Sequence, residues 1–250
     1  MKISPFNLDL SYVDLIFEVT RKCNMQCPHC IRGEAQNVNI SKKVIDSVLS
    51  QIGSVSVFTV SGGEPLLNLR AINYILNQMN ERGVFFQEFW FATNGTILTK
   101  GVEDLIRNLY YCATDKDISG IRVSIDPYHE DIINRWKWED LKETLNYRDG
   151  IDINFEMRGA PEPRYLISDG RAKDNYYSER KPEPSLYLCE DGRISGALYI
   201  TVYGDLISTC DASYETMMLP EFKIGNVKDG ICEILANYFN AYPQYVDKFN

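Results

Sequence analysis

The sequence predicts an α/β fold in which helices join the strands of a parallel sheet. Two observations predict it. Short runs of β-branched and aromatic residues alternate along the first 160 residues with longer segments whose apolar residues recur at helical spacing. The 250 residues, 44% hydrophobic and 24% charged, are also enough to bury a full core. Because strands joined by helices run parallel, their carboxyl ends should meet at one edge of the sheet.

The first strands and helices are predicted from local pattern. Val13–Thr20 is rich in β-branched and aromatic residues and is followed by a polar segment, so a strand is expected. Ser41 is a suitable N-cap, because apolar residues follow it at helical spacing up to residue 52. Residues 55–60 return to a strand. Residues 69–81 then form the second helix, with Gly83 as its stop.

The same alternation continues through the middle of the chain. Residues 87–93 and 120–125 have the composition of strands, and residues 100–110 between them have the spacing of a helix. A fourth helix is expected over residues 133–147, and a fifth strand over residues 151–157.

The pattern changes after residue 159, and this change divides the chain. Residues 160–185 hold four prolines and many charges without a clear period, which predicts a long loop. Residues 186–210 read as a hairpin, and residues 230–238 as a short amphipathic helix. The predicted parts are a core over residues 1–160, a loop over 161–185 that completes or covers it, and an extension over 186–250.

Charge and hydropathy exclude some classes of partner. The net charge of −9 argues against a nucleic-acid backbone as the partner, because proteins that bind one usually present a basic face. No stretch approaches the roughly 18 uninterrupted apolar residues of a membrane span. The amino terminus shows no secretory signal, so we expect a cytoplasmic protein whose thiols stay reduced.

Three of the seven cysteines crowd into one short loop directly after the first strand. In a reducing compartment such crowding indicates a metal centre or catalysis before it indicates a disulfide. Thiolates from Cys23, Cys27 and Cys30 can hold three corners of an iron–sulfur cube and leave the fourth iron without a protein ligand. The amine and carboxylate of an amino acid could chelate that open iron.

Two other metal sites remain as alternatives. In a zinc site, Cys27 and Cys30 would supply one half and Cys189 and Cys210 the other, which leaves Cys23 redundant. A ferredoxin-like cluster would need a fourth cysteine nearby. A non-catalytic protein, in which zinc or a cluster serves structure or sensing, is therefore the rival from a different class.

A glycine-rich turn follows the second strand. Gly62 and Gly63 would allow the backbone to approach a ligand closely, and Glu64 with exposed carbonyls could accept hydrogen bonds from an ammonium group. The simpler interpretation is an ordinary turn in which Pro65 begins a helix.

These two motifs together resemble the signatures of the radical S-adenosylmethionine (SAM) superfamily. The spacing of Cys23, Cys27 and Cys30 is similar to its Cys-x3-Cys-x2-Cys loop, and Ser61–Pro65 looks like its GGEP motif. The resemblance implies an enzyme with a [4Fe-4S] cluster on the three cysteines and SAM at the open iron. It also implies a partial (β/α)6-type TIM barrel with its site at the carboxyl ends of the strands. Here the barrel is expected to be abbreviated, because five strands are predicted where the family has six.

The same resemblance assigns roles to further residues at strand ends. Asn94 lies in a segment similar to the TNG turn of the family, and Ser124 and Asp126 would face the methionine and ribose of SAM. His29 would lie flat against the adenine, and otherwise is a solvent-facing loop residue. Arg158 could meet the SAM carboxylate with two hydrogen bonds, and a structural salt bridge is the alternative.

The C-terminal part resembles a shortened SPASM/twitch extension, a small β-hairpin plus a helix. The resemblance rests on Gly170–Ala172, Cys189, Val202–Cys210 and Ile224–Val227. In that extension cysteines help to hold an auxiliary iron–sulfur cluster. The later cysteine-rich block is missing here, so a remnant pair of Cys189 and Cys210 beside the substrate opening is favoured over an auxiliary cluster, which remains the alternative. Cys232 is expected to be buried on the last helix, and Cys112 has no motif around it.

The function that the resemblance implies is reductive cleavage of SAM to methionine and a 5'-deoxyadenosyl radical, which abstracts hydrogen from a substrate. The SPASM/twitch likeness favours a peptide or protein side chain as that substrate, and a small metabolite or nucleotide is the alternative. An external electron donor such as flavodoxin or ferredoxin is implied as a partner.

Overall fold

The computed structural model describes residues 3–125, 129, 135–159, 165–175 and 178–246. Its strands are β1 (Val13–Thr20), β2 (Ser54–Gly62), β3 (Phe85–Thr93), β4 (Gly120–Ser124), β5 (Asn154–Arg158), β6 (Tyr187–Leu188), β7 (Ile194–Ser195), β8 (Ala197–Ile200), β9 (Asp205–Ile207) and β10 (Lys223–Asn226). Its helices are α1 (Lys42–Leu49), α2 (Leu69–Arg82), α3 (Lys100–Cys112), α4 (Arg135–Asp149), α5 (Ala172–Asn175) and α6 (Ile231–Ala241).

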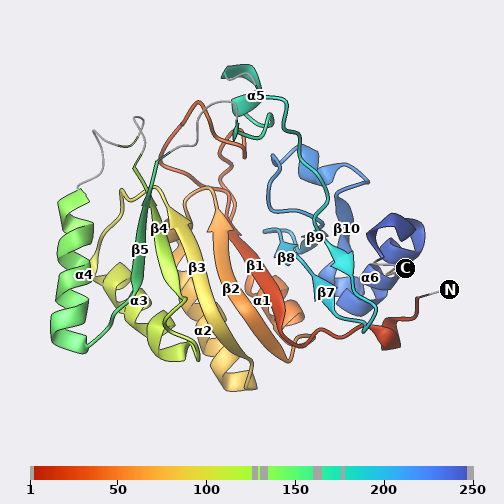
Figure 1. Ribbon diagram of the computed structural model, residues 1–250, viewed down its shortest axis with the longest axis horizontal. Coiled ribbons are helices and arrows are strands. Elements are labelled where there is room, and N and C mark those ends of the chain that lie inside the picture. The colour runs from red at the N-terminus through yellow and green to blue at the C-terminus, as the bar shows by residue number, and fades with distance from the viewer. Residues whose placement is uncertain (1–2, 126–128, 130–134, 160–164, 176–177, 247–250) are drawn as a thin grey trace.

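The main sheet is open and mostly parallel. Its order is β10-β9-β8-β1-β2-β3-β4-β5, and β1 to β5 pair with their sequence neighbours in parallel. Helices α1, α2 and α3 lie against one face of the sheet, and α4 lies beside β5 at its edge (Figure 1). This confirms the predicted α/β class. Among the described strands the sheet does not close into a barrel, because β8 occupies the edge of β1 that closure would need.

The predicted elements of the core are confirmed to within a few residues at their ends. The Ser41 side chain accepts a hydrogen bond from the Val44 backbone N–H and so caps α1, as its position predicts. Gly83 ends α2 in the left-handed conformation, which costs a glycine little. Strand β5 begins three residues later than expected, because Ile151 and Ile153 are buried outside the ladder.

The C-terminal part differs from the single predicted hairpin. The chain forms two: β6 with β7, and β8 with β9, each antiparallel. Strand β8 also pairs in parallel with β1, and β10 adds to β9, so the extension continues the main sheet. The predicted division into core, loop and extension remains a prediction, and the first and last of these parts share one sheet.

The core lies between the sheet and helices α1 to α3. Phe17, Phe58, Phe89 and Ile72 are almost completely buried there. Burial of one such side chain stabilises the fold by about 2 kcal/mol. The inward face predicted for the last helix is confirmed, because Ile231, Ile234, Leu235 and Phe239 are buried.

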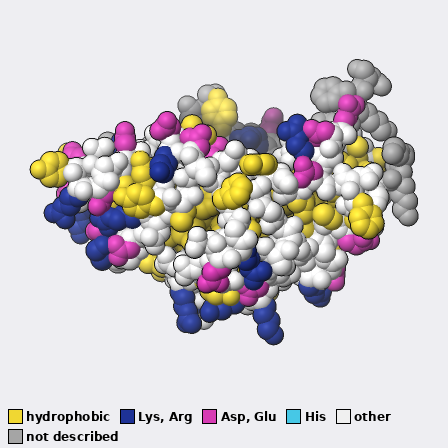
Figure 2. Space-filling view, turned by 90° about the horizontal axis from the view of Figure 1, so that it is seen from below, with side chains coloured by type: hydrophobic (Ala, Val, Ile, Leu, Met, Phe, Trp, Pro, Cys, Tyr) yellow, Lys and Arg dark blue, Asp and Glu magenta, His cyan; other side chains and the backbone are white. Residues whose placement is uncertain are grey.

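The face of the molecule at the amino ends of strands β1 to β5 carries both charged and hydrophobic side chains (Figure 2). Figure 2 shows hydrophobic side chains near the centre of that face, with Lys and Arg interspersed among Asp and Glu around it. None of the described helices is both long enough and apolar enough to cross a membrane.

Candidate functional site

A cavity of about 640 Å³ lies at the carboxyl ends of the parallel strands. It brings together most of the residues that the motifs single out: Cys23, Cys27, His29, Cys30, Gly63, Glu64, Asn94, Ser124 and Arg158. Gly62 lies beside it, and Asp126 lies outside the described residues. The register of the sheet explains the convergence, because parallel strands end at one edge and their loops meet there.

The cysteine loop leaves β1 and forms one wall of the cavity. Its turn is closed by a 3.1 Å hydrogen bond from the Cys30 backbone N–H to the Cys27 carbonyl. Burial raises the pKa of the Cys23 thiol, and a hydrogen bond from the Met25 backbone opposes that rise. A metal-bound thiolate escapes this burial cost because the metal compensates its charge.

Three thiols from one short loop line the same cavity. Within the described ranges, no three His, Cys, Asp or Glu side chains lie close enough to hold a single metal ion. Zinc needs every sulfur at about 2.3 Å from one centre. In a four-iron cluster each thiolate binds a different iron, so its sulfurs stand further apart. The three thiols on one cavity match the three protein ligands that the predicted cluster needs.

The two glycines of the second motif approach the cysteine loop itself. A Cβ on Gly62 would lie 2.1 Å from the Thr20 carbonyl oxygen, and one on Gly63 would lie 2.3 Å from the Lys22 carbonyl oxygen. The Gly63 N–H donates to Thr20, and the Glu64 N–H donates to Lys22. The backbone of Gly62 and Gly63 therefore approaches the backbone at the start of the cysteine loop closely. This contact fixes the turn after β2 against the cysteine loop.

The Glu64 carboxylate is buried and accepts hydrogen bonds from neighbouring donors. Its Oε2 accepts a 2.8 Å hydrogen bond from the Asn94 backbone, and its Oε1 accepts from the Leu66 backbone and the Thr93 hydroxyl. Burial raises the pKa of Glu64 to about 7, although these hydrogen bonds favour the charged form. Three of its acceptor positions are already used, so at most one remains for an ammonium group.

Asn94 links the turn after β3 to the cysteine loop. Its side-chain N–H group donates a 2.8 Å hydrogen bond to Asn24 and lies 4.0 Å from the Cys23 sulfur. The Asn24 side chain in turn donates to Thr96. Asn94 therefore reaches the cysteine loop directly, a contact that turn chemistry alone does not predict.

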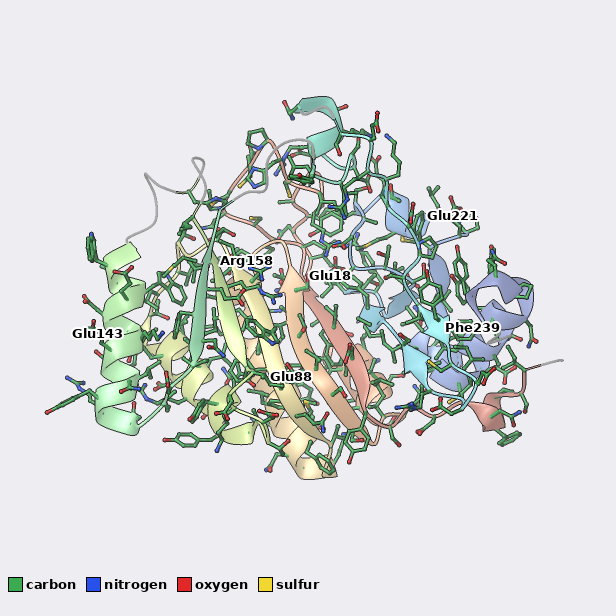
Figure 3. The ribbon with its side chains drawn as sticks, in the orientation of Figure 1. Glu18, Glu88, Glu143, Arg158, Glu221 and Phe239 are labelled. Atoms are coloured by element: carbon green, nitrogen blue, oxygen red, sulfur yellow. The ribbon has the colours of Figure 1, made fainter. Side chains whose placement is uncertain are left out.

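Arg158 lies at the end of β5, on the cavity wall, and Glu18 lies at the corresponding end of β1 (Figure 3). The Arg158 guanidinium forms a 2.7 Å ion pair with Glu156 and its side chain is 58% exposed. Glu156 also pairs with Arg122, whose guanidinium stacks over the Trp90 ring at 4.3 Å. Arg158 thus forms the salt bridge of the alternative and also lines the cavity, and its contact with the SAM carboxylate stays a prediction.

Several cavity residues carry no motif in the sequence. His129 is buried, and its Nε2 lies 3.8 Å from the Cys27 sulfur. Its ring centroid lies 6.1 Å from that of His29, so both histidines of the protein meet here. Tyr165 and Arg180 reach the cavity from the long predicted loop. No periodic signal marks these residues, because an irregular segment carries them.

The two later cysteines are not brought together. Cys189 lines a second cavity, of about 570 Å³, with Ile3 and Gly192 beside the segment that precedes β1. Cys210 lies near the main cavity, where burial and the neighbouring Asp211 raise the pKa of its thiol to about 11. The expected remnant pair is therefore wrong for Cys189. The same separation removes the zinc site that required Cys189 and Cys210 beside Cys27 and Cys30.

The remaining cysteines lie away from these contacts. Cys112 is exposed at the end of α3. Cys232 is half-buried on α6 and packs against the core, close to the burial expected for it.

Comparisons with known proteins agree with this geometry. A family model described as a 4Fe-4S single cluster domain matches residues 15–126. A probable GTP 3',8-cyclase of Methanocaldococcus jannaschii is 26% identical over 149 residues, which are 56% of this chain and 46% of that protein. A 7-carboxy-7-deazaguanine synthase of Hyperthermus butylicus is 24% identical over 99 residues, 38% of this chain and 41% of that protein.

Among solved structures, anSMEcpe with bound AdoMet and Cp18Cys peptide superposes with a TM-score of 0.56. The alignment covers 93% of this chain and 81% of that chain at 12% identity, so the likeness is one of fold. The chain spans about a third to a half of the length of the curated relatives that it matches.

Proposed function

We propose that the chain is a radical SAM enzyme that reductively cleaves SAM at a [4Fe-4S] cluster, and its similarity to a 4Fe-4S single cluster domain and to GTP 3',8-cyclases supports this proposal. One observation carries the proposal: the three cysteine thiols line a single cavity with Gly63, Glu64 and Asn94. When bound, the cluster and SAM would supply an electron and a 5'-deoxyadenosyl radical that abstracts hydrogen from a substrate.

The residues of the cavity suit the binding of these groups. Cys23, Cys27 and Cys30 would hold the cluster. The cavity that they line has a volume in the range of small-molecule sites, which suits the binding of SAM beside the cluster. Arg158 would bind the SAM carboxylate, because it lines the cavity and remains more than half exposed beside Glu156.

Further residues would complete the SAM site. His29 presents an aromatic ring to the cavity for the adenine, and Ser124 presents a hydroxyl for a polar part of SAM. Glu64 and Gly63 hold the cavity wall in place through their hydrogen bonds to the neighbouring turns. Asp126 remains a predicted SAM contact and would face, together with Ser124, the methionine and ribose of SAM.

For the substrate we propose a peptide or protein side chain. The chain shares its fold with a protein solved with a peptide bound, which supports this choice. Arg122, Glu156 and Trp90 also form a partly exposed charged and aromatic row that begins at Arg158, and such a row suits an extended chain. A nucleotide is the second candidate, because GTP 3',8-cyclases are among the sequence relatives.

The test of SAM cleavage starts from anaerobic reconstitution with iron and sulfide, followed by reduction and an assay for 5'-deoxyadenosine. We expect product from the wild type and none from C27A, since loss of one ligand removes the cluster site. C232A is the matched control and should retain product, because Cys232 lies in the core contacts of α6.

Outcomes of this assay separate the two classes of function. Product from C27A contradicts the assignment of the cluster. Zinc uptake without SAM binding favours the non-catalytic alternative. For the substrate, a rise of 5'-deoxyadenosine on addition of short peptides supports the peptide proposal, and a rise with GTP instead favours a nucleotide.

A further inference from the structure

The segment Asp169–Arg171 lies directly against the cysteine loop. The Arg171 backbone N–H donates a 2.9 Å hydrogen bond to the Cys30 carbonyl, and its Nε donates a 3.0 Å hydrogen bond to the Cys27 carbonyl. One residue therefore holds the carbonyls of two predicted cluster ligands, although it lies more than 140 positions away in the sequence.

Glycine before Arg171 makes this approach possible. Gly170 has a φ of 54°, and a Cβ there would lie 2.3 Å from the Ile31 carbonyl oxygen and 2.7 Å from the Cys30 carbonyl oxygen. Any other residue would push the segment away from the loop. The backbone of Gly170 thus closes on the loop as tightly as that of Gly63 does on its other side.

Asp169 fixes the segment to the C-terminal extension. Its carboxylate accepts a 2.6 Å hydrogen bond from the Ser213 backbone and a 3.0 Å hydrogen bond from the Thr216 hydroxyl. It is 6% exposed, so both bonds are shielded from water. The extension therefore supports the segment that in turn supports the cysteine loop.

The Arg171 guanidinium also sets a charge beside the cysteines. Its side chain is 18% exposed, and its Nη1 pairs at 3.0 Å with Glu34, which is 74% exposed. Because Glu34 is mostly exposed, water screens its negative charge strongly. Water screens the positive charge of the mostly enclosed Arg171 guanidinium less. Since arginine stays protonated at any working pH, the positive charge at this position is permanent.

We propose that Arg171 is a positioning residue of the cluster centre, which holds the loop through two carbonyls and raises the reduction potential of the cluster by its charge. The inference rests on the proposed function of the three cysteines. A nearby positive charge favours the reduced cluster, which carries one more negative charge, and hydrogen bonding around the ligands tunes the same equilibrium.

The experiment compares reconstituted wild type, R171Q, R171K and the control R193Q by redox titration followed with EPR and by iron loss to a chelator. R171Q should have a lower midpoint potential than the wild type and lose iron on the order of tenfold faster, as expected for loss of a residue that orients ligands. R171K keeps the charge without the planar donor pair, so it should restore the potential more than the iron retention.

R193Q is matched because Arg193 also pairs with a carboxylate, that of Asp191, but its backbone contacts Cys189 and not the cysteine loop. It should behave like the wild type. An R171Q cluster with the potential and iron retention of the wild type overturns this inference and leaves the proposed function intact. A wild type that takes up no four-iron cluster overturns the proposed function, and this inference with it.

If R171Q does not fold, E34Q provides the second measurement. Removing the Glu34 charge leaves the Arg171 guanidinium less neutralised, so the midpoint potential should rise above that of the wild type. An unchanged or lower potential in E34Q contradicts the electrostatic part of the inference.

Discussion

Glu64 shows how one buried carboxyl serves two turns at once. It joins the turn after β2 to the turn after β3 through hydrogen bonds from Thr93 and the Asn94 backbone. Those donors favour its charged form, whereas burial favours its neutral form and raises its pKa to about 7. Desolvation is the larger effect because the side chain is almost fully enclosed.

This raised pKa predicts a pH dependence of stability. The folded carboxyl keeps its proton up to about pH 7, and the unfolded one only up to about 4.5, so the folded state binds more protons between these values. Stability should be highest below pH 4.5 for this group and fall as the pH rises through 7, by at most about 3 kcal/mol. Urea unfolding across this range should show a smaller fall for E64Q than for the wild type. An equal fall in both would contradict the prediction.

Gly63 allows a second prediction at the same scale. In G63A the new Cβ would lie 2.3 Å from the Lys22 carbonyl oxygen and 3.0 Å from the Cys23 Cβ, so the cysteine loop must move. We expect G63A to bind less iron after reconstitution than the wild type. G53A is the control, because nothing lies within 4 Å of a Cβ at Gly53. Equal iron contents in G63A and G53A would show that the loop tolerates the shift.

The residue types of the site could be predicted from the sequence, but many of their partners could not. The cysteine and glycine motifs were placed at strand ends by local pattern, and the cavity contains nearly all of them. The hydrogen bonds of Glu64 come from the following βα turn. His129 and Arg171 lie in or after segments without periodicity, so only the folded chain brings them to the cysteine loop.

At the scale of elements, a buried polar network joins the end of β1 to the chain after β8. The fully buried Glu18 carboxylate accepts hydrogen bonds from the Arg21 guanidinium, the Tyr199 hydroxyl and the Val202 backbone. Arg21 also stacks over the Tyr214 ring at 4.2 Å. The network therefore ties the start of the cysteine loop to the C-terminal extension.

Breaking this network should be costly. E18Q leaves the Arg21 guanidinium buried without its counter-charge, and loss of one partner of a buried pair typically costs about 3 kcal/mol or more. Y199F removes one hydrogen bond and should cost about 1 kcal/mol. Urea unfolding at neutral pH would measure both losses of stability, with E221Q, a change at an exposed residue, as the control. If the E18Q variant were as stable as E221Q, the ion pair of Glu18 with Arg21 would contribute nothing to the stability of the fold.

The regular elements were predictable to the extent that their pattern was local. Strands β1 to β5 and helices α1 to α4 show clear periodicity, and their bounds differ little from expectation. Strand β10 is four residues long, which is too short to show a period of its own. The parallel pairing of β8 with β1 joins distant segments, and no local signal encodes it.

At the scale of the whole molecule, the distribution of cysteines predicts one cluster per chain. Cys189 lines a different cavity from the three loop cysteines, so it is not gathered with them or with Cys210 as a ligand of a second cluster. Reconstituted protein should therefore contain about four iron atoms per chain, as one [4Fe-4S] cluster has. The variants C189A and C210A should keep that content, and C30A should lose it. About eight iron atoms, or a loss in C210A, would indicate an auxiliary cluster.

The pairing of β1 with β8 also bears on how the protein is made. Strand β1 is synthesised before its partner at Ala197–Ile200, which follows roughly 180 residues later. Arg171 and Ser213, which support the cysteine loop, are late as well. A nascent chain on the ribosome thus holds the three cysteines long before their supports exist. Cofactor insertion should consequently follow synthesis of these later segments, when β8 has paired with β1.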